Sequence, residues 1–286
     1  MPGILFSLRR LHKTSRALSL DVVIGVLAMA VFAAKMLKEE ISANWLLILA
    51  LATWSFYTAD HLLDAFKTKG NTQIFRHRLH YKYSYLLGIL SVVSAIIAAA
   101  LSYFFFETKI IEYGLFIGLM VTVYFVLLSF NKGRKWKFLQ KEFIIALVYV
   151  AAIWLAPLVW LSENPATYII FIICIMFLLT WAEGIMASYF DYDNDLKDGH
   201  TSFAIVFGIG ITLKLLKFFH FTMLVILLIL MFYADIKMTR NAYSILFAMN
   251  LILFSITLFP AYFEKDEKYR IIGEMVFWIP MILIFV

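Results

Sequence analysis

Long apolar segments separated by short charged connections run through the whole sequence. Because a hydrocarbon core about 30 Å thick needs roughly 20 apolar residues per α-helix, we expect each segment to cross a membrane once. Backbone groups in lipid must form hydrogen bonds within their own segment, so helices are the expected form. The nine expected spans lie at 17–37, 43–59, 83–106, 112–130, 142–162, 166–190, 205–233, 242–263 and 270–286. The pattern therefore predicts an all-α integral membrane protein with nine transmembrane helices in a single membrane domain, residues 1–286.

The segment 205–233 is longer than one span requires, and it carries Lys214 and Lys217 near its start. A lysine side chain is costly at the centre of a bilayer. We therefore expect the first part of this segment to form a short interfacial or tilted piece that leads into the true span.

Basic residues are distributed unevenly between the two sides of this bundle. The amino-terminal tail, the second, fourth and eighth connections, and the sixth connection with the start of the next span hold 20 of the 25 Lys and Arg residues. Because cytoplasmic loops are enriched in Lys and Arg, we expect a multi-pass protein with its amino terminus in the cytoplasm. Basic loops that face anionic lipid headgroups also account for the net charge of +6. No nucleic-acid partner is therefore expected, and the sequence leaves the oligomeric state open.

Composition excludes the main alternatives to a membrane protein. Hydrophobic residues make up 63% of the chain and charged residues 15%, against about 45–50% and about 25% in soluble globular proteins. A soluble domain of this length could not bury so much apolar surface. The only cysteine, Cys174, lies inside an apolar segment, which excludes a disulfide scaffold. The abundance of aromatic residues excludes intrinsic disorder.

Aspartates are concentrated at two points of the chain. Six of the nine lie in two short stretches, 60–64 and 191–198. Asp60 and Asp64 are four residues apart, as are Asp191 and Asp195, so each pair faces one side of its helix. The two stretches are separated by an even number of spans and therefore emerge on the same, cytoplasmic side. If the second and sixth helices are neighbours, the two aspartate clusters face each other across one entrance.

Such an arrangement is unfavourable unless a cation is bound. Two like charges about 4 Å apart repel by roughly 4 kcal/mol at an effective dielectric constant near 20. Mg²⁺ relieves this repulsion, because it binds a few carboxylates and completes its coordination with water and phosphate oxygens. The expected metal ligands are Asp60, Asp64, Asp191 and Asp195. The basic residues expected to bind a diphosphate are Arg76, Arg78, Lys132 and Lys197.

The second aspartate cluster resembles the second aspartate-rich motif of the UbiA superfamily of intramembrane prenyltransferases. In that family an Asp-x-x-x-Asp is followed by a Gly four residues later, then by Thr and a small apolar stretch that ends in Gly. Asp191, Asp195, Gly199, Thr201 and Gly208 match this pattern. The basic segment 132–142 is also similar to the basic loop that follows the fourth helix in this family.

The first cluster matches the family less completely. The family pattern is Asn-x-x-x-Asp-x-x-x-Asp followed by an Arg-containing segment. If Asp60 takes the position of the Asn, Asp64 is the central aspartate and Thr68 replaces the last one. If Asp60 and Asp64 are the two aspartates, Phe56 replaces the Asn. Either alignment lacks one ligand and leaves the number of bound Mg²⁺ ions open.

The resemblance implies a UbiA-like helical bundle with a central cavity. It also implies Mg²⁺-dependent transfer of a prenyl group from a prenyl diphosphate to a lipophilic acceptor within the membrane. An aromatic acceptor is expected, although neither its identity nor the prenyl chain length follows from the sequence. Asp64, Asp191 and Asp195 are the expected catalytic residues.

Two other functions remain open at this stage. Acidic residues in membrane helices also line the pathways of transporters and ion-coupled carriers. The incomplete first cluster is compatible with a UbiA-like terpene cyclase as well. His77 and His80 have the spacing of half a zinc site, but further nitrogen or sulfur ligands are not evident from the sequence. We therefore expect this histidine pair to face lipid headgroups.

Overall fold

The computed structural model describes residues 13–130 and 141–284. Every regular element in these ranges is helical. Seven of the helices are long and apolar enough to cross a membrane, which confirms a multi-pass integral membrane protein. They are α2 (Leu20–Leu37), α3 (Ala43–Thr68), α5 (Ser84–Phe105), α7 (Lys141–Trp160), α8 (Thr167–Phe190), α11 (Ile209–Tyr233) and α12 (Lys237–Leu258). An eighth long helix, α6 (Thr108–Phe130), lies at the fourth expected span.

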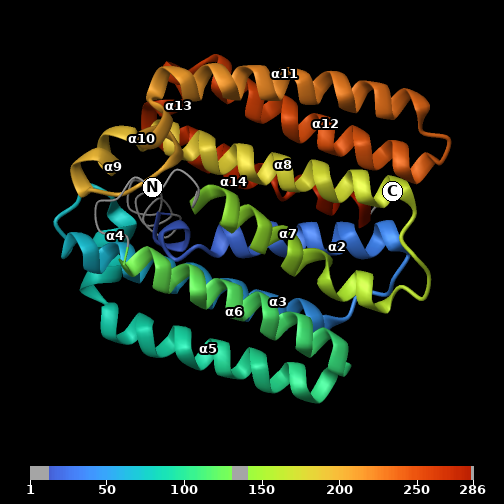
Figure 1. The fold of residues 1–286 in the computed structure, drawn as a ribbon, viewed down its shortest axis with the longest axis horizontal. Coiled ribbons are helices and arrows are strands. Elements are labelled where there is room, and N and C mark those ends of the chain that lie inside the picture. The colour runs from blue at the N-terminus through green and yellow to red at the C-terminus, as the bar shows by residue number, and fades with distance from the viewer. Residues whose placement is uncertain (1–12, 131–140, 285–286) are drawn as a thin grey trace, which may run out of the picture.

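Short helices occupy the connections at one end of this bundle. Figure 1 shows α4 (Phe75–Lys82), α9 (Tyr192–Asp198), α10 (Phe203–Phe207) and α13 (Pro260–Glu264) together at the left-hand end. Of these, α4 and α9 belong to the second and sixth connections of the predicted topology. Helix α10 extends from the sixth connection into the next expected span, and α13 lies at the end of the eighth expected span. The alternation of the long helices therefore places both aspartate stretches at the same end, as the sequence pattern predicts.

The segment 205–233 is divided into a short and a long helix, but the division comes before Lys214 and Lys217, which belong to the long helix. Gly208 separates the short helix α10 from the long helix α11, and its φ angle is +88°. An L-residue with a side chain rarely adopts this backbone conformation, whereas glycine does so without steric cost. Gly208 thus allows the chain to change direction between the short piece and the span.

The prediction of a ninth regular span at 270–286 is wrong for the described part of that segment. It contains α14 (Lys268–Val276), preceded by the 3₁₀ helix η1 (Lys265–Glu267) and followed by the 3₁₀ helix η2 (Ile279–Ile284). Two physical causes are visible in the sequence. Arg270 and Glu274 make the first part amphipathic rather than apolar, and Pro280 lacks the amide proton that an α-helix needs.

Helix α2 lies at the centre of the bundle and is the most completely buried of the seven spans. It packs against α3, α7, α12, α14 and η2. Four alanines between Ala28 and Ala34 are fully buried, and small side chains of this kind let neighbouring helix backbones approach closely. Gly25, which has no side chain, also allows a close approach, because a Cβ atom there would lie 3.2 Å from Cβ of Phe277.

Polar side chains connect helix pairs in the outer parts of the bundle. Ser55 of α3 and Ser91 of α5 each donate a hydrogen bond to the other's carbonyl oxygen, at 2.9 and 3.0 Å. On the opposite side, Nδ1 of His220 in α11 lies 2.7 Å from Oδ1 of Asn250 in α12, and Asn250 Nδ2 donates to the carbonyl oxygen of His220 at 2.9 Å. Both side chains are fully buried. The His220–Asn250 pair therefore fixes how α11 and α12 are aligned.

We expect Asn250→Ala to destabilise the protein by about 1–2 kcal/mol, the upper range for hydrogen bonds between membrane helices. The substitution removes both bonds and leaves the imidazole of His220 buried without its partner. Unfolding in mixed micelles of a mild detergent and dodecyl sulfate measures the change. Ser255→Ala is the matched control, because Ser255 is on the same helix but bonds only to the carbonyl of Leu251 within it. Equal stability of the two variants would contradict this role of Asn250.

Candidate active site

A cavity of about 220 Å³ opens among α2, α3, α4, α7, α8, α9 and α14, at the end of the bundle that carries the short helices. Both aspartate clusters line it. Asp60 and Asp64 come from the last turns of α3, Asp191 from the junction of α8 with α9, and Asp195 from α9. The two clusters therefore face one shared cavity, as expected from their spacing and topology.

Lys141 holds the first cluster together. Its Nζ lies 2.9 Å from Oδ2 of Asp60 and 3.0 Å from Oδ2 of Asp64. Both aspartates are buried, so they need a compensating positive charge nearby. Because Lys141 is the first residue of α7, the ion pairs also tie the end of α3 to the start of α7. Lys67, one turn after Asp64, lies 3.6 Å from Oδ1 of Asp64.

Arg270 and Tyr269 hold the second cluster from the opposite side of the cavity. The guanidinium of Arg270 forms an ion pair with Oδ2 of Asp191, and Tyr269 Oη donates to Oδ1 at 2.8 Å. Asp191 raises the pKa of Arg270 above its usual value, although burial alone would lower it. Arg76 of α4 lies 4.0 Å from the same carboxylate. Asp191 is thus the point where α4, α8 and α14 converge.

Acidic groups outnumber basic ones in the cavity wall. Burial, together with the negative charge of Asp191, raises the pKa of Asp195 to about 7. Among the described residues, four Lys and Arg side chains line the cavity: Lys67, Arg76, Lys141 and Arg270. Seven carboxyl groups line it: Asp60, Asp64, Glu142, Glu183, Asp191, Asp195 and Glu274. The cavity wall therefore offers more carboxyl groups than its Lys and Arg side chains can pair with.

Two histidines complete the rim near Asp64. The ring of His77 in α4 lies 5.8 Å from the ring of His200, centroid to centroid, and His200 Nδ1 is 3.6 Å from Oδ1 of Asp64. Burial and the neighbouring Arg76 lower the pKa of His77 to about 2. Burial also lowers the pKa of His200, although Asp64 opposes the effect. Both imidazoles are therefore neutral at pH 7 and add no positive charge to the rim.

The connection between α9 and α10 is held in place by side chains of the neighbouring spans. Glu142 of α7 accepts a hydrogen bond from the amide of Phe203 at 2.8 Å, and Ser188 Oγ of α8 accepts one from Ala204 at 3.3 Å. These bonds satisfy amide groups at the start of α10 that have no partner within the helix. They also hold the preceding residue, Ser202, against the cavity wall.

The inner wall of the cavity is largely aromatic and apolar. Tyr57 lies two turns before Asp64 in α3, and Tyr149 lies two turns after Lys141 in α7, so both are deeper in the bundle than the charged rim. Phe277 packs edge-on against Tyr149 with ring centroids 5.8 Å apart. The cavity therefore combines a charged mouth with an interior suited to an apolar chain.

The expected phosphate-binding residues differ in their positions. Arg76 lines the cavity. Arg78 is exposed and donates to the carbonyl oxygens of Thr72 and Gln73, at 2.9 and 3.0 Å, and Lys197 is also exposed. Residues two apart on a helix face different directions, so Arg78 points away from Arg76, and Lys197 away from Asp195. Lys132 lies outside the described residues.

Lys141, Arg270 and His200 are the important cavity residues that the sequence analysis did not single out. Lys141 is the last basic residue before an apolar segment, which is a detectable but common signal. Arg270, at the start of the ninth expected span, was counted only as one of the basic residues on the side that holds Asp191. No local pattern connects residues 79 positions apart in the sequence.

Comparison with known proteins identifies the fold from structure alone. No protein-family model matches the sequence, and no curated protein matches it. By contrast, several solved structures superpose on almost the whole chain.

Two of these structures are of a UbiA homologue from Archaeoglobus fulgidus. The form bound to DMAPP and Mg²⁺ is 16% identical to this chain and superposes with a TM-score of 0.66. The form bound to GPP and Mg²⁺ is also 16% identical and superposes with a TM-score of 0.63. Each alignment covers 95% of this chain and 99% of the other. The apo structure of a UbiA homologue from Aeropyrum pernix K1 is 11% identical, with a TM-score of 0.59, and the alignment covers 92% of this chain and 98% of that one. The fold implied by the sequence resemblance is therefore confirmed, and this chain is an all-α membrane protein with the fold of the UbiA homologues.

Proposed function

We propose that this protein is a Mg²⁺-dependent prenyltransferase that joins the prenyl group of a prenyl diphosphate to a lipophilic acceptor within the membrane. The observation that carries the proposal is the meeting of four aspartates from two distant motifs in one cavity with a charged mouth and an aromatic interior. Support comes from the shared fold with homologues bound to DMAPP or GPP together with Mg²⁺.

The residues of the cavity fit Mg²⁺. Carboxylate oxygens are the ligands that this hard cation prefers, and it completes its coordination with water and phosphate oxygens. The excess of carboxyl groups over Lys and Arg side chains provides oxygen ligands for such an ion, which would displace any proton that they carry. Oε2 of Glu142, which lines the cavity, is also buried without a hydrogen-bond partner in the described structure. Asp60, Asp64, Asp191 and Asp195 are the residues that would hold the metal.

The basic side chains of the cavity bind the diphosphate in this proposal. Lys141 and Arg270 compensate the aspartates in the described structure, and both are close enough to the same space to bind phosphate oxygens. Arg76 adds a guanidinium that suits two-point binding of a phosphate. Bound Mg²⁺ supplies electrostatic stabilisation of the departing diphosphate. The protein's own cations hold the diphosphate in place while the allylic carbon–oxygen bond breaks.

The inner wall accommodates the prenyl chain. The faces of Tyr57, Tyr149 and Phe277 present π electrons, which attract the positive charge that develops on the allylic carbon. The same side chains exclude water, which otherwise captures such a carbon as an alcohol. The acceptor must therefore reach the reacting carbon from the apolar side of the cavity.

A transporter is less consistent with this arrangement. Transporters commonly bind their substrates near the membrane midplane, where helices are interrupted. Here the acidic residues of the cavity gather at one end of the bundle, and each of the seven spans is a continuous helix.

We expect Asp191→Asn to lower kcat/KM for prenyl transfer by about 100-fold or more at fixed Mg²⁺, because it removes a charge that holds the metal–diphosphate group. Membranes containing the protein are incubated with radiolabelled geranyl or longer diphosphates and a panel of lipophilic acceptors. Asp193→Asn is the matched control: Asp193 is exposed on α9 and does not line the cavity, so its substitution leaves activity within about twofold. Equal turnover by the Asp191 variant, or a cyclic product formed without any acceptor, would contradict the proposal.

The proposal also places the mouth of the cavity on the cytoplasmic side. In a Cys174→Ser background, Lys197→Cys reports on the end that holds the aspartates, and Glu40→Cys reports on the opposite end, between α2 and α3. Both positions are exposed. A membrane-impermeant maleimide should label Glu40→Cys in intact cells and Lys197→Cys only after the membrane is opened. The reverse pattern would show that the positive-inside assignment is wrong.

A further inference from the structure

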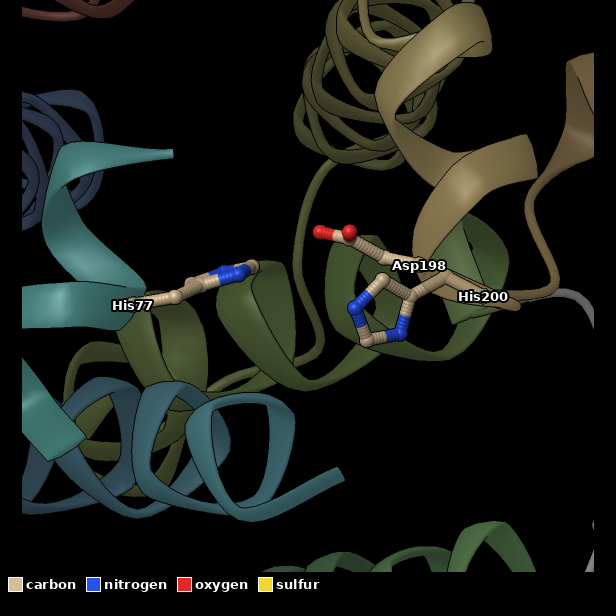
Figure 2. A group of neighbouring side chains, drawn as sticks. All are labelled: His77, Asp198 and His200. Carbon is tan, nitrogen blue, oxygen red and sulfur yellow. The ribbon is translucent and has the colours of Figure 1, made fainter. Parts of the chain in front are cut away.

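Three side chains at the edge of the cavity form a group of a different kind from the four aspartates. His77 comes from α4, Asp198 is the last residue of α9, and His200 follows two residues later. One donor atom of each lies within 4.8 Å of the donor atoms of the other two. In Figure 2 the His77 ring extends from one side toward the Asp198 carboxylate and the His200 ring on the other. Asp198 does not line the cavity, so this group extends beyond the aspartate site.

Ring nitrogens of both histidines that could bind a metal lack hydrogen-bond partners in the described structure. Both ring nitrogens of His77, which is only 2% exposed, and Nε2 of His200 are buried without a partner in the described structure. The side chain of His200 is 10% exposed. Leaving a buried polar atom unpaired costs about 1–3 kcal/mol. A ligand bound between the two rings removes this cost.

The third donor is already oriented by its surroundings. Thr72 Oγ1 donates to Oδ2 of Asp198 at 2.5 Å and accepts a hydrogen bond from the amide of Ile74 at 3.2 Å. These bonds fix the carboxylate and leave its Oδ1 for another ligand. On the other side of the group, Asp64 Oδ1 lies 3.6 Å from Nδ1 of His200. A carboxylate behind a histidine is the usual outer partner of a metal-bound imidazole, because it orients the ring and selects its tautomer.

We propose that His77, Asp198 and His200 form a binding site for a divalent transition metal, with Zn²⁺ the ion that fits best. Two imidazole nitrogens and one carboxylate are typical zinc ligands, whereas Mg²⁺ prefers oxygen. Zinc–ligand bonds of about 2.0–2.1 Å place the donors of a tetrahedral site about 3.3 Å apart, so the widest pair must close by at most about 1.5 Å. Rotation of the side chains supplies this movement. The fourth position is left for water.

A metal at this site joins two segments that carry the aspartate motifs. His77 belongs to the helix that follows the first aspartate pair, and the other two ligands follow the second pair. The ion therefore links α4 to the connection between α9 and α10 across the mouth of the cavity. This role does not depend on which reaction the cavity performs.

The test measures Zn²⁺ binding to the purified full-length protein in detergent, after chelation and in excess Mg²⁺ to occupy sites that contain only oxygen ligands. Competition with a chromophoric chelator gives the stoichiometry and affinity. The variants are His77→Gln and Asp198→Asn. The matched control is Asp193→Asn, which makes the same change of charge at an exposed position on the same helix as Asp198.

We expect one Zn²⁺ per chain in the wild type and in Asp193→Asn, and an affinity at least about tenfold lower in His77→Gln and Asp198→Asn. Bound Co²⁺ should show the absorption of a tetrahedral site in the first two proteins only. Each variant is first checked for a single symmetric peak in size-exclusion chromatography. If only one of the two ligand variants is folded, its Zn²⁺ affinity alone decides the test. No Zn²⁺ binding by the wild type, or unchanged affinity in a folded variant, would overturn the proposal. Because no prenyl substrate is present, this result is independent of the prenyltransferase assay.

Discussion

The need to compensate buried carboxylates determines how the cavity end of this bundle is built. Asp60, Asp64 and Asp191 are removed from water, and each lies against a Lys or Arg from another part of the chain. Removing one partner of a buried ion pair costs about 3–5 kcal/mol. Lys141 therefore fixes the start of α7 against the end of α3, and Arg270 fixes α14 against the end of α8. The charged side chains that line the cavity are therefore also the side chains that connect the helices at this end of the bundle.

The balance of charges in the cavity explains how its aspartates and basic side chains can exchange one ion-pair partner for another. In the described structure, Lys141 and Arg270 are bound to aspartates, yet carboxyl groups still outnumber the Lys and Arg side chains of the wall. Under the proposed function, a divalent cation and a diphosphate enter together and add charges of both signs. The aspartates then have the metal as a partner, and the basic side chains have the phosphate oxygens. The electrostatic cost of opening the original pairs is offset by the new ones.

In the last part of the chain, contacts with the cavity replace a regular membrane span. Residues 268–276 form a short amphipathic helix because Arg270 and Glu274 face the cavity, while Tyr269 bonds to Asp191. Its Gly273 packs against α8, since a Cβ atom there would lie 3.1 Å from Cε of Met186. The chain then continues as a 3₁₀ helix beside α2. A continuous apolar helix at this point would place no cation next to Asp191.

The features that depend on local periodicity can be predicted from the amino-acid sequence. The length of each apolar segment indicates a membrane helix, because bilayer thickness and helix rise are fixed. The four-residue spacing within Asp60–Asp64 and Asp191–Asp195 places each pair on one face, and the even number of spans between them places both at one end. The length of the segment 205–233 indicates that it is more than one span, although the position of the break at Gly208 is known only from the structure. These inferences need only the geometry of one helix or the order of several.

Contacts between side chains from distant helices, by contrast, cannot be predicted from the sequence and are seen only in the folded protein. Twenty-five Lys and Arg residues are present, and nothing local distinguishes Lys141 or Arg270 from the others. His77 and His80 have zinc-like spacing in the sequence, but the folded chain brings His77 to Asp198 and His200 instead. Such pairings depend on how helices rotate and pack against one another. That packing is set by many contacts between residues far apart in the sequence, of which Gly25 with Phe277 is one, and so no short stretch of sequence contains it.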